Sequence, residues 1–123
     1  MNRIEKDDVR EERIINEIIV DAYGPEEQAM GWYCYLEDRL AFPFKARCVQ
    51  ERRISPLRPG EEVDVMGIAP EEDCMHEMLV MIRWCDREMG VPLAQLEATG
   101  RDRERKEAIG DWHYWMARGY QLG

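Results

Sequence analysis

The chain has 123 residues and a formal net charge of -9, from 26 Asp and Glu against 17 Lys and Arg. This length is typical of one domain, so we expect a single unit over residues 1–123. The acidic balance argues against a nucleic-acid partner, whose phosphates require a basic face. No apolar run is long enough for a membrane helix, and residues 1–12 lack the hydrophobic region of a signal peptide. We therefore expect a cytoplasmic monomer without a membrane partner.

The cysteines, Cys34, Cys48, Cys74 and Cys85, are widely spaced and form no Cys-x-x-Cys pair. Nothing in the composition indicates export to an oxidising compartment, where disulfides persist. The expectation is four reduced thiols.

Helices are predicted over about residues 11–41. Ile and Ala side chains at helical spacing between residues 11 and 23 predict an amphipathic helix. Gly24 and Pro25 suit the end of one helix and the first position of the next. Glu26 and Glu27 then lie where the dipole of the second helix favours negative charge, and Pro43 ends that helix.

From residue 44 to about residue 98 the hydrophobic period changes from helical to alternating. Phe44, Ala46 and Cys48 alternate with Lys45 and Arg47, which is typical of a strand. The same period recurs at residues 63–65 and 78–84, and residues 91–96 offer a last short strand. Short strands separated by turns predict a small antiparallel sheet curled into an SH3-like barrel, and hence an α+β fold.

A C-terminal helix is predicted over about residues 101–118 from a return to helical spacing. Its charged run, residues 101–107, mixes both signs and indicates a solvated helix face without a function of its own. The aromatic residues Trp112 to Trp115 favour a core role, because a helix spreads four consecutive side chains around most of its circumference.

Negative charge is concentrated between residues 61 and 77, a window that contains no Lys or Arg. Residues 70–73 lie between two predicted strands, where a loop can turn several oxygens toward one point. Calcium takes about six to eight oxygen ligands in flexible geometry, a need that acidic loops can meet. A solubilising acidic turn is the alternative. The carboxylates of the window are Glu61, Glu62, Asp64, Glu71, Glu72, Asp73 and Glu77.

A second concentration of charge is the pair Glu37 and Asp38, in the last turn of the second predicted helix. The negative end of the helix dipole makes a carboxylate unfavourable there by about 0.3–1 kcal/mol. A cation should offset this penalty. Either the neighbouring Arg39 or a bound metal ion satisfies that requirement.

Other kinds of site have less support. Cys74 and His76 would share one face of a strand, but zinc sites need three or four ligands and His113 is distant in sequence. No Ser or Cys lies in a recognisable nucleophile turn, and there is no glycine-rich phosphate loop. We therefore expect no enzyme activity.

Several segments together resemble a known family. The stretch from Tyr23 to Asp38, which contains Gly-Trp-Tyr-Cys-Tyr-Leu-Glu-Asp and continues to Phe-Pro-Phe at residues 42–44, is similar to the cyanobacterial-type calcium-binding proteins of the CcbP kind. The similarity extends through residues 70–74, 91–96 and 111–115, and so covers most of the chain.

The resemblance implies cytoplasmic Ca²⁺ binding, as a buffer or in signalling, through clustered carboxylates that form no EF-hand. Asp38 is the first ligand that it implies, followed by Glu71, Glu72 and Asp73, with Glu37 and Glu77 as neighbouring candidates. The alternative hypothesis is an acidic SH3-like protein-interaction module without a metal. A loose carboxylate cage predicts a preference for Ca²⁺ over Mg²⁺ and no zinc site.

Overall fold

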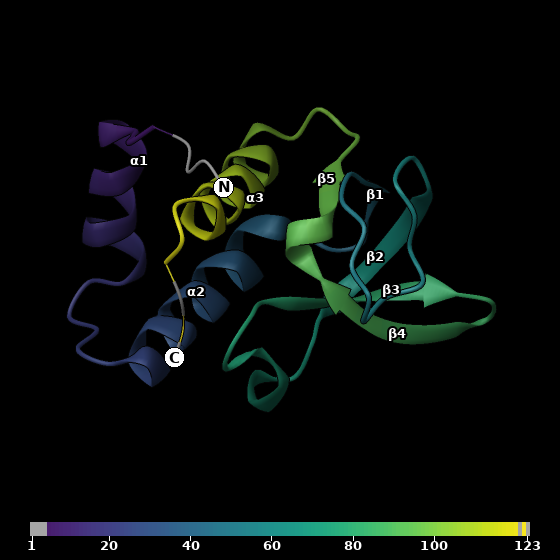
Figure 1. The fold of residues 1–123 in the computed structure, drawn as a ribbon, viewed down its shortest axis with the longest axis horizontal. Coiled ribbons are helices and arrows are strands. Elements are labelled where there is room, and N and C mark those ends of the chain that lie inside the picture. Colours follow the sequence, from purple (N-terminus) through teal and green to yellow (C-terminus); the bar gives the residue numbers. More distant parts are fainter. Residues whose placement is uncertain (1–4, 121, 123) are drawn as a thin grey trace.

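The computed structural model describes residues 5–120 and residue 122, and places helices on one side of the molecule and a sheet on the other (Figure 1). The single unit expected over residues 1–123 thus includes residues 1–4, 121 and 123, which lie outside the described part. The helical side contains α1 (Asp8–Arg13), the π-helical turn η1 (Ile14–Ile18), α2 (Pro25–Leu40) and α3 (Arg103–Ala117). The sheet contains β1 (Phe44–Cys48), β2 (Glu62–Ile68), β3 (Leu79–Trp84), β4 (Arg87–Pro92) and β5 (Leu96–Ala98), with short 3₁₀ turns η2 (Glu71–Cys74) and η3 (Leu93–Gln95) between strands.

The second predicted helix is confirmed as α2, and the first begins earlier than expected. Helix α1 starts after Asp7, whose side chain accepts the backbone N–H of Arg10 as an N-terminal cap. The helix then widens into η1 and ends at Ile18, five residues before the expected end at Tyr23. Asp21 follows with a positive φ of 58°, a conformation that interrupts a helix.

Helix α2 has the expected start and ends in a left-handed residue. Gly24 precedes Pro25, which occupies the first turn together with Glu26 and Glu27. Ala41 has a φ of 53° and turns the chain away from the helix axis toward the cis peptide Phe42–Pro43 and β1.

The strands form one antiparallel sheet in the order β4-β3-β2-β1-β5. Among the described residues β4 and β5 are opposite edges that do not pair, so the sheet is not closed and the expected SH3-like barrel is not confirmed. Within residues 5–120 the three-residue β5 pairs with β1 alone, and α3 packs beside it.

The strand predicted over residues 91–96 is wrong in its bounds. The chain forms β4 to Pro92, turns through η3, and starts β5 at Leu96. Strand β4 escaped prediction because its first residues, Arg87 and Glu88, are both exposed at an edge and show no alternation.

The helices enclose an aromatic core, as the C-terminal aromatic residues indicated. Trp32 from α2 lies 5.0 Å from Trp112 and 5.6 Å from Trp115, measured between ring centroids. All three side chains are buried, and α2 and α3 pack against each other through them. The core role predicted for Trp112 and Trp115 is therefore confirmed.

The four cysteines are unpaired in the structure: Cys48 and Cys74 are buried, and Cys34 and Cys85 are exposed. No helix of the described residues is both long and apolar enough to cross a membrane.

Candidate metal site

The carboxylates at the end of α2 project into solvent. Asp38 has a side chain that is 81% exposed, and its Oδ2 lies 3.7 Å from Nε of Arg39. The guanidinium of Arg39 is shared, because it also lies 3.9 Å from Glu17 and stacks 4.9 Å from the ring centroid of Tyr35. Such a loose surface pair contributes about 1 kcal/mol at most. Arg39 therefore leaves most of the charge at this helix end available to another cation.

The backbone carbonyls at the same helix end are satisfied by α3. Arg105 donates from Nε to the carbonyl oxygen of Leu40 at 2.6 Å and from Nη2 to that of Ala41 at 2.7 Å. Its guanidinium also stacks 4.6 Å from the ring centroid of Phe44. Arg105 thus supplies part of the positive charge that the C-terminal end of the helix dipole favours. It belongs to the charged run of residues 101–107, which the sequence indicated to be only a solvated face.

The acidic loop forms the 3₁₀ turn η2, which packs beside α2. Cys74 is buried and fixes the turn, since its sulfur accepts the backbone N–H of Leu79 at 3.4 Å. Glu71, Glu72 and Asp73 precede it and are exposed. The buried side chain of Cys74 thus fixes the turn, and the three carboxylates of the turn face solvent.

Tyr33 connects the helix end with the loop. The Tyr33 hydroxyl donates a hydrogen bond of 2.9 Å to the carbonyl oxygen of Ala69, just before η2. Burial raises the pKa of Tyr33, and the negative charges of Glu37, Glu71 and Glu72 raise it further, together with Cys74. Three carboxylates from two distant segments therefore act on one point of the molecule.

Glu77 is held differently from the other predicted ligands. Arg52 forms a two-pronged ion pair with it, at 2.8 Å to Oε2 and 2.9 Å to Oε1. The Glu77 side chain is only 17% exposed, and both of its oxygens are taken. Arg52 lies outside the window of residues 61–77, so the absence of Lys and Arg within the window did not mean that this charge is uncompensated.

The structure offers no preassembled metal centre. Among residues 5–120 and 122, no three His, Cys, Asp or Glu side chains are grouped so that they can hold an ion. Cys74 is buried while His76 is exposed, and burial raises the pKa of the Cys74 thiol, which disfavours the thiolate that zinc requires. The donor set near Tyr33 is made of hard oxygens on exposed side chains. It fits an oxygen-seeking cation that accepts irregular coordination.

Sequence reasoning missed the most buried carboxylate of the described residues. Asp111 of α3 is 0% exposed and is surrounded by donors from the other helices. Its oxygens accept hydrogen bonds from Arg10 at 2.7 Å, from Arg13 at 2.7 and 3.0 Å, and from the hydroxyl of Tyr35 at 2.9 Å. An acidic residue between Ile109 and Trp112 was the available signal. Because every oxygen is paired, this carboxylate fastens α1 to α3 and is not a ligand.

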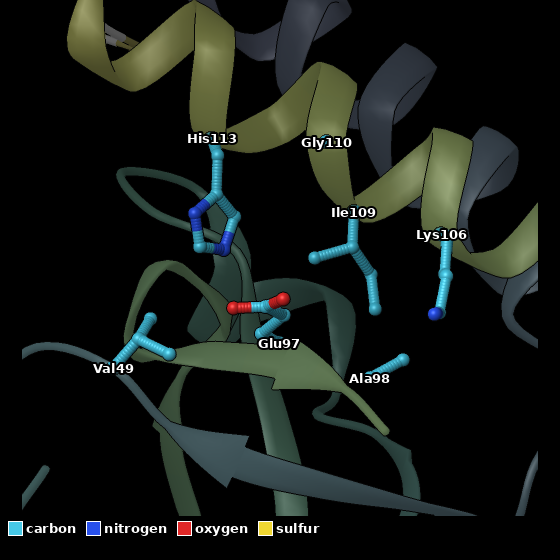
Figure 2. A pocket seen from close by; sticks show the side chains of 7 residues that line it. All are labelled: Val49, Glu97, Ala98, Lys106, Ile109, Gly110 and His113. Atoms are coloured by element: carbon cyan, nitrogen blue, oxygen red, sulfur yellow. The ribbon is translucent and has the colours of Figure 1, made fainter. Parts of the chain in front are cut away.

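A surface pocket of about 250 Å³ lies between β5 and α3, away from these carboxylates (Figure 2). Ala98 from the strand and Ile109 from α3 contribute apolar lining, and the His113 ring stands over Glu97 in this view. Nε2 of His113 is 2.7 Å from the carbonyl oxygen of Leu96, which fixes the ring orientation. One Glu and one His are too few ligands for a metal site.

An acidic α+β domain with exposed carboxylates at a helix end and on an adjacent turn is typical of proteins that bind cations through oxygen ligands. The comparisons agree with this class. Residues 12–116 match the CcbP family model, described as calcium binding. The crystal structure of CcbP from Anabaena is 43% identical in sequence, covers 98% of both chains and superposes with a TM-score of 0.85. The chain belongs to the CcbP family of calcium-binding proteins.

A second solved structure, described as a calcium-binding protein in the calcium-binding form, is 42% identical, covers 98% of both chains and has a TM-score of 0.84. No curated protein sequence matches the chain. The family resemblance seen in the sequence is thereby confirmed over nearly the whole length.

Proposed function

We propose that the protein binds Ca²⁺ without catalytic activity, as a cytoplasmic buffer or sensor. The observation that carries the proposal is the packing of η2, which bears Glu71 and Glu72, beside α2, which bears Glu37 near its C-terminal end. Carboxylates from two segments that pack together offer hard oxygen ligands to a divalent cation. The similarity to a protein described in its calcium-binding form supports Ca²⁺ as the ion.

We propose Glu37, Asp38, Glu71 and Glu72 as the main ligands, with Asp73 at the margin of the site. Asp38 follows Glu37 at the helix end, and its side chain is 81% exposed. Glu77 is left out of the set because Arg52 occupies both of its oxygens. Water completes the coordination, as it commonly does in Ca²⁺ sites with few protein ligands.

The chemistry of these ligands favours Ca²⁺ over other divalent cations. Mg²⁺ demands a tight octahedron and loses its water reluctantly, whereas side chains from a helix end and a short turn form a loose oxygen cage. Zinc prefers sulfur and imidazole, but the sulfur near Tyr33 is that of Cys74, which is buried and has a raised pKa that disfavours the thiolate. The unpaired thiols support a reducing compartment such as the cytoplasm.

Isothermal titration of Ca²⁺ in excess Mg²⁺ tests the proposal. Asp38→Asn and the double variant Glu71→Gln/Glu72→Gln remove charge while keeping shape, and each should weaken binding at least about tenfold, equivalent to about 1.4 kcal/mol. Glu88→Gln is the matched control, since it removes one exposed charge from β4 at the far edge of the sheet. Equal affinities in all four proteins would show that the ligands lie elsewhere, and no heat in any of them would reject Ca²⁺ binding.

A further inference from the structure

The turn between η1 and α2 exposes large apolar side chains. Val20 is 54% exposed and Tyr23 is 87% exposed, although the chain buries three of its tryptophans almost completely. Single exposed apolar residues are common on protein surfaces. Here, however, Val20 also lines a surface pocket.

This pocket, which we call the Val20 pocket, has a volume of about 380 Å³. Val20, Ala22 and Met30 provide its apolar lining, and Asp21, Glu26 and Glu27 provide its polar lining. Among the described residues that line it there is no Lys or Arg. The pocket therefore combines an apolar surface with carboxylates of a single sign.

Local structure explains the carboxylates only in part. Glu26 and Glu27 lie in the first turn of α2, where the helix dipole stabilises them. Asp21 has no such role, and it adds a third negative charge at a residue with a φ of 58°. The helix N-terminus thus accounts for the negative charges of Glu26 and Glu27. It does not account for the apolar lining of the pocket.

We propose that the Val20 pocket docks a basic amphipathic helix of a partner protein. An apolar side chain of that helix enters between Val20 and Met30, and its Lys or Arg residues face Asp21, Glu26 and Glu27. Amphipathic helices bind in this way, with apolar anchors in a groove and flanking charges that set orientation. The pocket adjoins the first turn of α2 and the proposed ligands lie in and beyond its last turn, so the two proposals are independent.

Fluorescence anisotropy with a labelled synthetic helix of Leu and Lys at amphipathic spacing tests the proposal, in a chelator that removes Ca²⁺. Val20→Ser and Glu26→Gln/Glu27→Gln should each weaken binding about tenfold, equivalent to about 1.4 kcal/mol. Glu62→Gln/Glu88→Gln removes the same charge from exposed strand positions and should leave affinity within about twofold, a difference of about 0.4 kcal/mol. The methyl resonance of Met30 should shift on binding.

Four results would overturn the proposal. Equal weakening by both double variants would show general attraction between a cationic peptide and an acidic protein. An unchanged Met30 resonance, or no binding, would place no helix in the pocket. Sedimentation that shows a dimer abolished by Val20→Ser would assign the surface to a second copy of the chain.

Discussion

The buried carboxylate of Asp111 differs from the exposed carboxylates near Tyr33 in how its charge is neutralised. Asp111 is buried among Arg10, Arg13 and Tyr35, and each of its oxygens is paired. Glu37, Glu71 and Glu72, at the end of α2 and on η2, are exposed to solvent. A buried charge must be neutralised by the protein itself, whereas an exposed, uncompensated group can be neutralised by a ligand. The comparison separates carboxylates that hold the fold from those available to an ion.

The largest effect is expected at the buried carboxylate. Asp111→Asn removes the charge opposite two arginines and should lower the free energy of unfolding by about 3 kcal/mol, because both cations lose their partner in a water-poor site. Urea denaturation followed by indole fluorescence measures this. Asp38→Asn, in the absence of Ca²⁺, is the contrasting variant and should change stability by less than about 0.5 kcal/mol. Equal losses of unfolding free energy in the two variants would show that the buried and the exposed carboxylate contribute alike to the fold.

The attachment of the first helical segment to α2 should depend on shape as well as charge. A Cβ at Gly31 would collide with the backbone carbonyl of Ile18. Gly31→Ala should therefore cost about 1–3 kcal/mol of stability, the usual range for overpacking. Gly67→Ala, where a Cβ would meet no atom within 4 Å, is the matched substitution and should be nearly neutral. A neutral Gly31→Ala would mean that η1 can move away from α2 at little cost.

Glu77 shares features with both kinds of carboxylate. It is mostly buried and ion-paired, like Asp111, but it belongs to the acidic window that contains candidate ligands. Glu77→Gln should cost about 1 kcal/mol of stability, a value reduced because Arg52 is partly exposed, and should leave Ca²⁺ affinity unchanged. Denaturation and calorimetric titration of the same preparation give both quantities. A clear loss of Ca²⁺ affinity would return Glu77 to the ligand set and imply that Arg52 releases it when the ion binds.

The smallest effect is a shift in the titration of one phenol. The carboxylates around Tyr33 help to raise its pKa, so Ca²⁺ bound among them should lower that pKa toward its ordinary value. The difference in phenolate absorbance between wild type and Tyr33→Phe, titrated toward high pH with and without Ca²⁺, isolates this group. The same titration with Mg²⁺ is the control. A Tyr33 pKa that does not respond to Ca²⁺ would place the ion away from the hydroxyl.

Stability should also fall above pH 10, the ordinary pKa of tyrosine. Burial raises the pKa of Tyr33, Tyr35 and Tyr114 in the folded protein, so the unfolded chain releases these protons first. Their contribution is complete below the unfolded pKa and is lost as pH rises through the folded pKa.

Most of the helical fold was predictable because its signals are local. Pro25 with Glu26 marks the start of α2, and the spacing of Trp112 and Trp115 marks the buried face of α3. The open sheet was less predictable, since alternation within a strand does not specify whether the first and last strands meet. An exposed edge such as Arg87 and Glu88 in β4 carries no alternation at all.

The sequence indicated the candidate ligands as a concentration of negative charge. It did not indicate which of these carboxylates form ion pairs within the protein. Arg52 reaches Glu77 from 25 positions earlier in the chain, and Arg105 reaches the end of α2 across 65 positions. Such pairings depend on tertiary structure, and a short segment of sequence, such as the acidic window of residues 61–77, does not contain both partners. For the same reason Asp111 could be noticed as an acid among apolar neighbours but not assigned its arginines.

The position of these arginines has a consequence for the order in which the molecule assembles during synthesis. Arg10 and Arg13 find Asp111 across 101 and 98 positions, whereas β3 and β4 are joined by a two-residue turn. Closing a long loop costs more entropy than closing a short one, and it requires both ends to exist. On the ribosome the β3–β4 hairpin can therefore form while α1 still lacks its anchor. The N-terminal segment is made first, and its anchor at Asp111 is made about a hundred residues later.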